Sequence, residues 1–144
     1  MSRYAHPERE QRWLLDTVPA GAADPVDISD RYIIGTRLRL RRAGEVLKLG
    51  QKIPVDGDTV SLTNMYLSAD EYAVFAALPA RELRKRRHFL TWHGHQIAVD
   101  EFLDRDLILA EVELALGADY LRLPPWAVKD VTHDTSYRGG ARAG

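Results

Sequence analysis

The sequence contains no cysteine, which excludes disulfide bonds and metal sites built on thiolates. It also has no apolar run long enough to cross a bilayer, and its first residues lack the apolar core of a signal peptide. A net charge of −1 leaves no overall excess that would attract a polyanion. We therefore expect a cytoplasmic protein without a membrane partner, in which any charged ligand is recognised through local sorting of charge.

Hydrophobic residues make up 45% of the 144 residues and charged residues 28%. These values are typical of one soluble globular domain with a real hydrophobic core. No repeat, low-complexity segment or interdomain linker divides the chain. We therefore treat residues 1–144 as a single domain and expect the glycine-rich residues 138–144 to form a flexible tail.

Short segments of alternating polar and apolar residues indicate strands, and turn signals separate them. The strand segments are residues 7–15, 31–42, 45–53, 58–67, 82–91, 96–103 and 106–115, with a last short one in 128–133. Ala43-Gly44, Asp56-Gly57 and His93-Gly94-His95 supply the turns. Residues 17–30 are rich in Pro, Gly, Ala and Asp and are predicted to be a loop.

Helices are few. Ser68 and Glu71 form a capping box at the start of one helix, which Pro79 follows closely, and residues 117–122 are predicted to form a second, short helix. Many short strands with few helices are typical of a mainly β fold (α+β), either an antiparallel barrel or a sandwich.

Like charges recur at a spacing of two, which places them on one face of a strand. The runs are Glu8 and Glu10; Arg37, Arg39 and Arg41; Lys48 and Lys52; Lys85 and Arg87; and Glu111 and Glu113. Any single run fits an ordinary solvent-exposed face. Together they would repel within one small domain unless a ligand compensates them. A barrel with a charged interior and an apolar exterior accommodates both faces.

That interior would be cationic overall and would still contain carboxylates. Its cations would be Arg12, Arg37, Arg39, Arg41, Lys48, Lys52, Lys85, Arg87 and Lys129, and its anions Glu8, Glu10, Asp100, Glu111 and Glu113. Arginine and lysine neutralise phosphate oxygens, whereas carboxylates hold hard cations such as Mg²⁺ or Mn²⁺. A polyphosphate with its divalent metal matches this combination.

The same residues resemble the motifs of the CYTH superfamily of triphosphate tunnel metalloenzymes, over nearly the whole chain. The motifs are residues 8–12 (EREQR), 36–41 (TRLRLR), 47–52 (LKLGQK), 83–88 (LRKRRH), 99–102 (VDEF), 109–114 (LAEVEL) and the closing segment 125–137. The LAEVEL strand is the most specific of them. The resemblance is to short bacterial members of the family.

The resemblance implies an eight-stranded antiparallel β-barrel tunnel with a few short helices packed outside. It implies that Glu8, Glu10, Glu111 and Glu113 bind Mg²⁺ or Mn²⁺, and that eight of the nine cations named above, all except Arg41, bind the substrate. Arg41 joins the predicted substrate-binding residues because it shares a strand face with Arg37 and Arg39. The resemblance also implies catalytic roles for Tyr32, as general acid or base, and for Lys85. The alternative for Tyr32 is that its phenol, with a pKa near ~10, simply packs at a strand start.

The resemblance further implies a metal-dependent triphosphatase, acting on a triphosphate-containing small molecule and above all on inorganic tripolyphosphate. Two departures from the family pattern affect that expectation: residues 61–67 (SLTNMYL) lack the carboxylate pair often found on this strand, and Asp130 stands where Glu is common. The first makes hydrolysis uncertain. The alternatives are a non-catalytic polyphosphate- or nucleotide-binding module, a class IV adenylyl cyclase and a thiamine triphosphatase.

Other features have plainer interpretations. His93 and His95 flank a turn glycine and suit an exposed loop better than a zinc site. The tryptophans suit packing outside the barrel. The basic run 81–87 is not interpreted as a nucleic-acid site, because alternation turns half of its charges inward. A monomer and a homodimer remain open.

Overall fold

The computed structural model describes residues 4–139, in which strands dominate. The strands are β1 His6–Leu15, β2 Ala23–Ile33, β3 Leu38–Ala43, β4 Val46–Asp56, β5 Thr59–Tyr66, β6 Ala80–Trp92, β7 His95–Phe102, β8 Ile108–Glu113 and β9 Lys129–Asp130. The helices are α1 Ala69–Ala76 and the 3₁₀ helix η1 Thr135–Tyr137. No helix within residues 4–139 combines the length and the hydrophobicity needed to cross a membrane.

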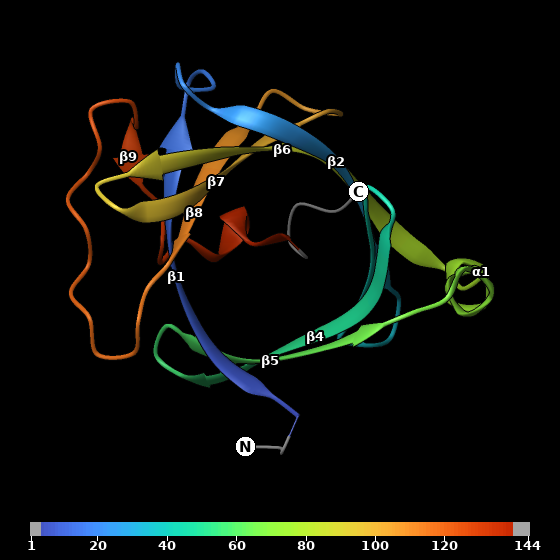
Figure 1. Cartoon of the computed structure of the whole chain (residues 1–144). Coiled ribbons are helices and arrows are strands. Elements are labelled where there is room, and N and C mark those ends of the chain that lie inside the picture. Colours follow the sequence, from blue (N-terminus) through green and yellow to red (C-terminus); the bar gives the residue numbers. More distant parts are fainter. Residues whose placement is uncertain (1–3, 140–144) are drawn as a thin grey trace.

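Eight of the strands close into an antiparallel barrel, as predicted. They are hydrogen-bonded in the order β5-β4-β3-β2-β6-β7-β8-β1, and β1 pairs back with β5 to complete the ring (Figure 1). The N-terminal half of β1 makes this closure, whereas its C-terminal half pairs with β8 and with the two-residue β9. Closure leaves no long unpaired edge, because every strand of the ring has two neighbours.

The sequence prediction was wrong for β2. Residues 17–30 were expected to be a loop, but β2 begins at Ala23 and pairs with both β3 and β6. Asp and Pro are poor strand formers, yet pairing on two sides overrides propensity where Ile28 and Asp30 are buried. Residues 31–42 are likewise not one strand, because a turn containing Gly35 (φ 81°) separates β2 from β3.

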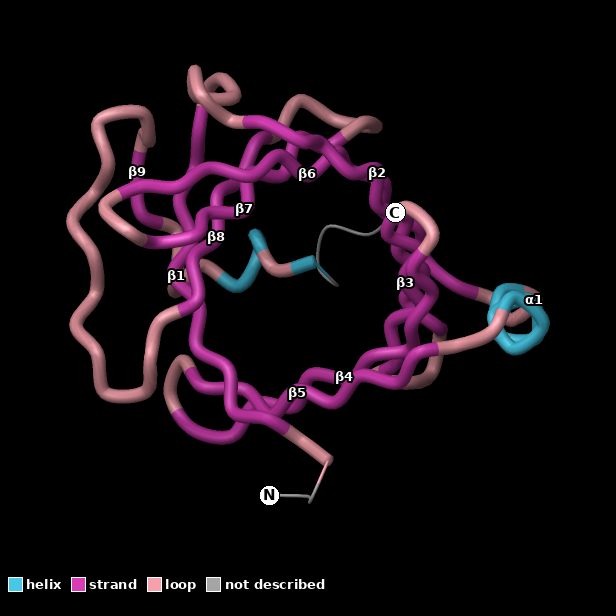
Figure 2. The backbone as a smooth tube through the Cα atoms, viewed as in Figure 1, coloured by secondary structure: helices cyan, strands magenta, loops and turns pink. Residues whose placement is uncertain are grey.

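The predicted capping box is present at α1. Ser68 accepts a hydrogen bond from the backbone N–H of Glu71, whose side chain accepts one from the backbone N–H of Ser68. This helix lies outside the barrel beside β3 and β4 (Figure 2). The helix expected at residues 117–122 does not form; these residues belong to the long connection between β8 and β9.

Apolar packing surrounds part of the barrel from outside. Trp13 of β1 is fully buried, and its ring meets Trp92 at 6.2 Å and Trp126 at 5.7 Å, both edge to face. Trp126 comes from the β8–β9 connection, which therefore covers this side of the sheet. The tryptophans pack externally, as the sequence indicates.

A second apolar cluster lies inside the barrel, toward one end. It consists of Leu83, Phe102, Leu109 and Val131, and Tyr137 packs against it. The C-terminal segment that carries Tyr137 lies within the ring in Figure 1. These side chains, with Tyr32 also packed against them, fill part of the lumen at this end.

Candidate functional site

The lumen contains a cavity of about 1030 Å³, lined by residues of the strands and of the turn between β2 and β3. All but one of the residues predicted to bind metal or substrate or to act in catalysis line it: Glu8, Glu10, Arg12, Tyr32, Arg37, Arg39, Arg41, Lys48, Lys52, Lys85, Arg87, Glu111 and Glu113. Because strand side chains alternate, the intervening Arg84 and Arg86 are left on the exposed outer side. Cationic side chains outnumber carboxylates in the lining, although the whole chain carries −1.

Lys129 is the exception. It lies on β9, opposite Leu14, is exposed and is not part of the cavity lining. Arg37 does line the cavity, but from the turn between β2 and β3 and not from the strand face on which the sequence analysis placed it.

Two buried aspartates form ion pairs with three of the cations that line the cavity. Asp30 is fully buried and accepts hydrogen bonds from Arg41 Nε at 2.7 Å and Nη2 at 2.8 Å. Burial acts to raise the pKa of Asp30, but the hydrogen bonds and charge of Arg41 outweigh burial and hold that pKa below its ordinary value. Arg41 is thus neutralised by a carboxylate that the sequence analysis assigned to a loop.

Asp100 serves two cations of β6. Its Oδ2 lies 2.8 Å from Lys85 Nζ, and it accepts hydrogen bonds from Arg87 Nε at 2.7 Å and Nη2 at 2.9 Å. Lys85 is so deeply buried that desolvation lowers its pKa despite Asp100. Arg87 keeps a raised pKa, because Asp100 outweighs the burial that acts to lower it. The two cations are held rigidly, and Lys85 is the easier of them to deprotonate.

Arg39 and Lys48 differ, because no carboxylate within residues 4–139 forms an ion pair with either of them. The Nε atom of Arg39 is buried without a hydrogen-bond partner. Burial and the charge of Arg41 lower the pKa of both side chains. The charge of both side chains is therefore available to an anion.

Gly50 explains how Arg39 fits. It lies directly opposite Arg39 on β3 and Asn64 on β5. A Cβ atom at position 50 would lie 2.7 Å from Asn64 Oδ1 and 3.2 Å from Arg39 Nη2. The glycine therefore leaves the space that both side chains occupy.

The four glutamates lie on two neighbouring strands, with Glu10 directly opposite Glu113. Lys52 Nζ lies 3.0 Å from Glu8 and 3.1 Å from Glu10, and Arg12 Nε donates to Glu111 at 3.1 Å. No three acidic or histidine side chains in the described part of the chain converge as a ready metal site.

The donors nevertheless suit a hard cation. Carboxylate oxygens are the ligands that Mg²⁺ and Mn²⁺ take, and the buried Oε1 atom of Glu8 lies against a cation already, Lys52 Nζ at 3.0 Å. Glu10 and Glu113 are like charges in direct cross-strand opposition, which is unfavourable without a cation. The glutamates therefore fit a divalent metal that displaces Lys52.

The inward-facing residues of β5 are Val60, Leu62 and Asn64. None is a carboxylate, so the lumen face of this strand offers only an amide. Thr63 alternates with Asn64 along the strand and points away from the lumen, so Asn64 is the one of the two that faces the site.

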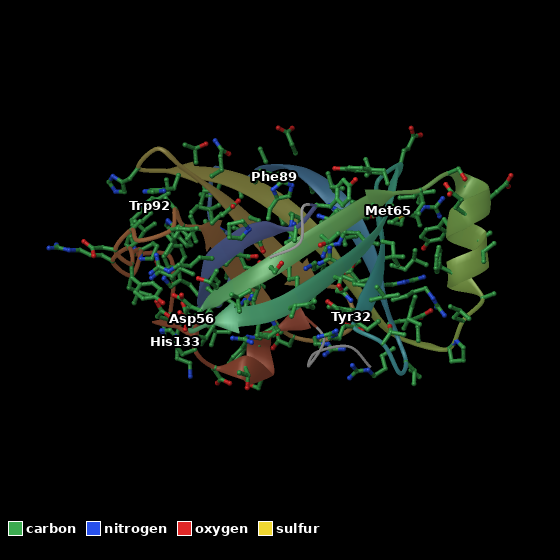
Figure 3. The ribbon with its side chains drawn as sticks, turned by 90° about the horizontal axis from the view of Figure 1, so that it is seen from below. Tyr32, Asp56, Met65, Phe89, Trp92 and His133 are labelled. Atoms are coloured by element: carbon green, nitrogen blue, oxygen red, sulfur yellow. The ribbon has the colours of Figure 1, made fainter. Side chains whose placement is uncertain are left out.

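Tyr32 lies near one end of the lumen, close to the C-terminal segment (Figure 3). Burial, followed by the charge of Asp30, raises the pKa of its phenol, which therefore keeps its proton at neutral pH. Gly139 packs so closely on the Tyr32 hydroxyl that a side chain at position 139 would collide with it. Residues 140–144 of the predicted tail lie outside the described residues.

Sequence reasoning missed several lining or supporting residues: Asp30, Gly50, Asn64, Arg81 and Arg138. Asp30 fell in a segment interpreted as loop, and Arg138 in one interpreted as tail. Only Asp30 left a usable signal, since it alternates with the inward-facing Ile28 and Tyr32.

No protein-family model and no curated protein sequence match this chain. Solved structures do. Two crystal structures of the protein NE1496, one of them identified as an inorganic triphosphatase, each have a TM-score of 0.69 with it. Their identities are 25% and 24%, and the matches cover 94% of this chain and 97% and 93% of theirs. A candidate adenylate cyclase from Bacillus halodurans has a TM-score of 0.60 at 15% identity, covering 76% of this chain and 81% of its own.

Proposed function

Since the chain has the tunnel fold of the CYTH superfamily, we propose that it is a metal-dependent triphosphatase that hydrolyses inorganic tripolyphosphate in its lumen. The observation that carries this proposal is the contrast among the lumen cations. Arg41 forms an ion pair with the buried Asp30, and Lys85 and Arg87 share the buried Asp100, whereas no described carboxylate forms an ion pair with Arg39 or Lys48. An anionic ligand with several charged oxygens would supply the negatively charged partners that these two cations lack.

The paired cations have a different task. Arg41 and Arg87 are each held by two hydrogen bonds to an aspartate, so their remaining N–H groups have fixed positions. Donors fixed in advance need no reorganisation when negative charge develops on a phosphoryl group. Arg39 and Lys48 would then bind the phosphate chain, and Arg87 and Lys85 would stabilise the charge of the transition state.

Glu8, Glu10, Glu111 and Glu113 would hold Mg²⁺ or Mn²⁺. The metal would neutralise phosphate oxygens and activate water for attack. If the metal displaces Lys52 from Glu8 and Glu10, the ammonium group of Lys52 becomes free to bind the phosphate chain. The same displacement would therefore provide both the metal site and one more cation for the substrate.

Hydrolysis would proceed by in-line attack of water on a terminal phosphorus atom. The new P–O bond forms as the bridging P–O bond breaks, and the products are orthophosphate and pyrophosphate. Tyr32 keeps its proton because its pKa is raised. We therefore assign it the role of hydrogen-bond donor to a phosphate oxygen and not that of general base.

A nucleoside triphosphate is the second candidate substrate. The observation that favours it is the apolar part of the lining, formed by Val60, Leu62, Phe89 and Ala98, which is compatible with an organic group. The cyclase-like neighbour points the same way. The neutral face of β5 favours a third candidate, a module that binds polyphosphate without cleaving it.

Phosphate release from tripolyphosphate, ATP and thiamine triphosphate, each measured with Mg²⁺ and with Mn²⁺, tests these candidates together. The expected result is release from tripolyphosphate that falls about tenfold or more in Arg39→Gln at subsaturating substrate and persists in Arg84→Gln, whose arginine faces outward. Tight binding without release would establish the binding module instead. Release only from a nucleotide, or pyrophosphate release from ATP, would establish the second candidate.

A further inference from the structure

A second, exposed group of arginines surrounds an opening of the cavity beside the C-terminal segment. Arg37 comes from the β2–β3 turn, Arg81 from the start of β6 and Arg138 from the residue after η1. All three line the cavity and all three are exposed. The three residues come from separate parts of the chain, and we call them the arginine opening.

The register shows that the opening adjoins the proposed site. Tyr32 is the cross-strand partner of Arg81 on β6 and of Arg39 on β3. Its hydroxyl is covered by Gly139, the residue after Arg138. Figure 3 shows Tyr32 near the end of the barrel where the C-terminal segment lies. Tyr32 thus stands between the buried cations and the arginine opening.

The arginines of the opening differ from several others on the surface. Arg9, Arg31, Arg86 and Arg105 each form an ion pair with a nearby carboxylate. Among the residues that the structure describes, no such pair involves Arg37, Arg81 or Arg138. Three uncompensated charges around one opening repel one another, and a polyanion relieves that repulsion.

The opening also has room. A hollow of about 520 Å³ is lined by Gly35, Thr36, Arg37, Leu38 and Gln51. All five residues also line the main cavity, so the two spaces adjoin, and Arg37 is the member of the arginine opening that lines both. A linear anion bound among the buried cations would therefore have adjoining space beside Arg37 for further phosphoryl groups.

We propose that the arginine opening binds phosphoryl groups beyond the three held in the lumen, so that this chain takes linear polyphosphates longer than tripolyphosphate. The inference rests on the proposed function and deepens it by naming the substrate class. One end of the phosphate chain lies in the lumen, and the remainder leaves through the opening along Arg37, Arg81 and Arg138.

Calorimetry without divalent metal, so that nothing is hydrolysed, compares tripolyphosphate with a longer linear polyphosphate, each expressed per chain. The longer chain is expected to bind about tenfold more tightly, a gain that exposed charge pairs can supply together. Arg81→Gln/Arg138→Gln should abolish the gain and leave tripolyphosphate binding unchanged. Arg84→Gln/Arg86→Gln, which removes the same charge from the outer face of β6, should retain the gain.

The outcomes separate this inference from the proposed function. If tripolyphosphate binds and the longer chain binds no more tightly, the proposal for the arginine opening is wrong and the proposed lumen site is unaffected. A gain that survives Arg81→Gln/Arg138→Gln, or that Arg84→Gln/Arg86→Gln removes equally, shows diffuse attraction and also overturns it. Failure of both phosphates to bind overturns both proposals. The gain should also shrink as salt rises, because the arginines are exposed.

Discussion

Asp30 and Arg41 face each other across β2 and β3 and form a two-pronged ion pair that is buried in the barrel wall. The pair changes the interpretation of the arginines on β3. Arg41 and Arg39 share a strand face, yet one charge is neutralised by the protein and the other is not. A charge that is neutralised in the wall stabilises the fold, and an uncompensated one is available to a ligand.

Arg41→Gln should therefore destabilise the protein by about 3–5 kcal/mol, the range for removing one member of a buried ion pair. The physical reason is that Asp30 would remain buried without its counter-ion. Urea unfolding with and without tripolyphosphate measures the effect. Loss of ligand binding with unchanged stability of the free protein would mean that Arg41 is a ligand residue and not part of this pair.

Arg39→Gln should behave in the opposite way. Removing an unpaired, desolvated cation beside Arg41 should leave the free protein as stable as before or slightly more stable, as the lowered pKa of Arg39 indicates. Binding of tripolyphosphate should weaken by ~1.5–3 kcal/mol, the scale of a hydrogen bond to a charged group. Arg84→Gln is the matched control, and an equal loss there would show that strand parity does not determine binding.

Stability should fall in acid because of Asp30 and Asp100. Both have pKa values below the ordinary one, since hydrogen-bonded cations outweigh their burial. Such groups contribute stability that is complete above the unfolded pKa of about 3.9 and is lost as pH falls through the lower folded values. Urea midpoints between about pH 6 and pH 2 should show this decline. Asp30→Asn/Arg41→Met, which removes one pair entirely, should flatten it.

Much of the lumen could be predicted from alternation alone. Lys85 and Arg87 face inward and Arg84 and Arg86 outward, because a strand allows only two faces. Closure into a barrel followed from the many short strands together with the family resemblance.

The pairing of charges could not be predicted in this way. Whether Arg41 or Arg39 meets a carboxylate depends on β2, and residues 23–30 contain Asp and Pro residues that disguise a strand. Tertiary pairing, which local propensity does not encode, places Asp30 opposite Arg41. The entry of the C-terminal segment into the lumen was hidden for a similar reason, since residue 138 has glycine neighbours and no periodic pattern.

Glu113→Gln should weaken Mn²⁺ binding while leaving the free protein at least as stable. Glu113 lies opposite Glu10, so neutralising it relieves a like-charge contact. Calorimetry with Mn²⁺ and thermal unfolding check the two halves of this expectation. Glu101→Gln, on the outward-facing side of β7, is the control. A large fall in melting temperature with unchanged Mn²⁺ affinity would assign Glu113 to the fold.

The last prediction concerns β5, whose lumen face carries Asn64 and no carboxylate. Substrate-free protein should bind one divalent metal tightly through the glutamates of β1 and β8. A second should bind only weakly, through the phosphate oxygens of the substrate, an arrangement that Mg²⁺ tolerates because it keeps several waters. Calorimetry should then give a stoichiometry near one, and turnover should rise further with metal after that site is full.

Asn64→Glu adds a carboxylate inside the lumen, whereas Thr63→Glu adds the same charge on the outside. Only the first should tighten binding of the second metal and raise turnover.

Asn64 Oδ1 and Arg39 Nη2 both lie close to Gly50, so the new carboxylate can instead pair with Arg39. In that case the affinity for the second metal stays low, and the affinity for tripolyphosphate without metal falls. This second measurement distinguishes pairing of the new carboxylate with Arg39 from metal binding. Two tight metals in the unsubstituted protein would show that other residues replace the missing carboxylates, and the one-metal interpretation would be wrong.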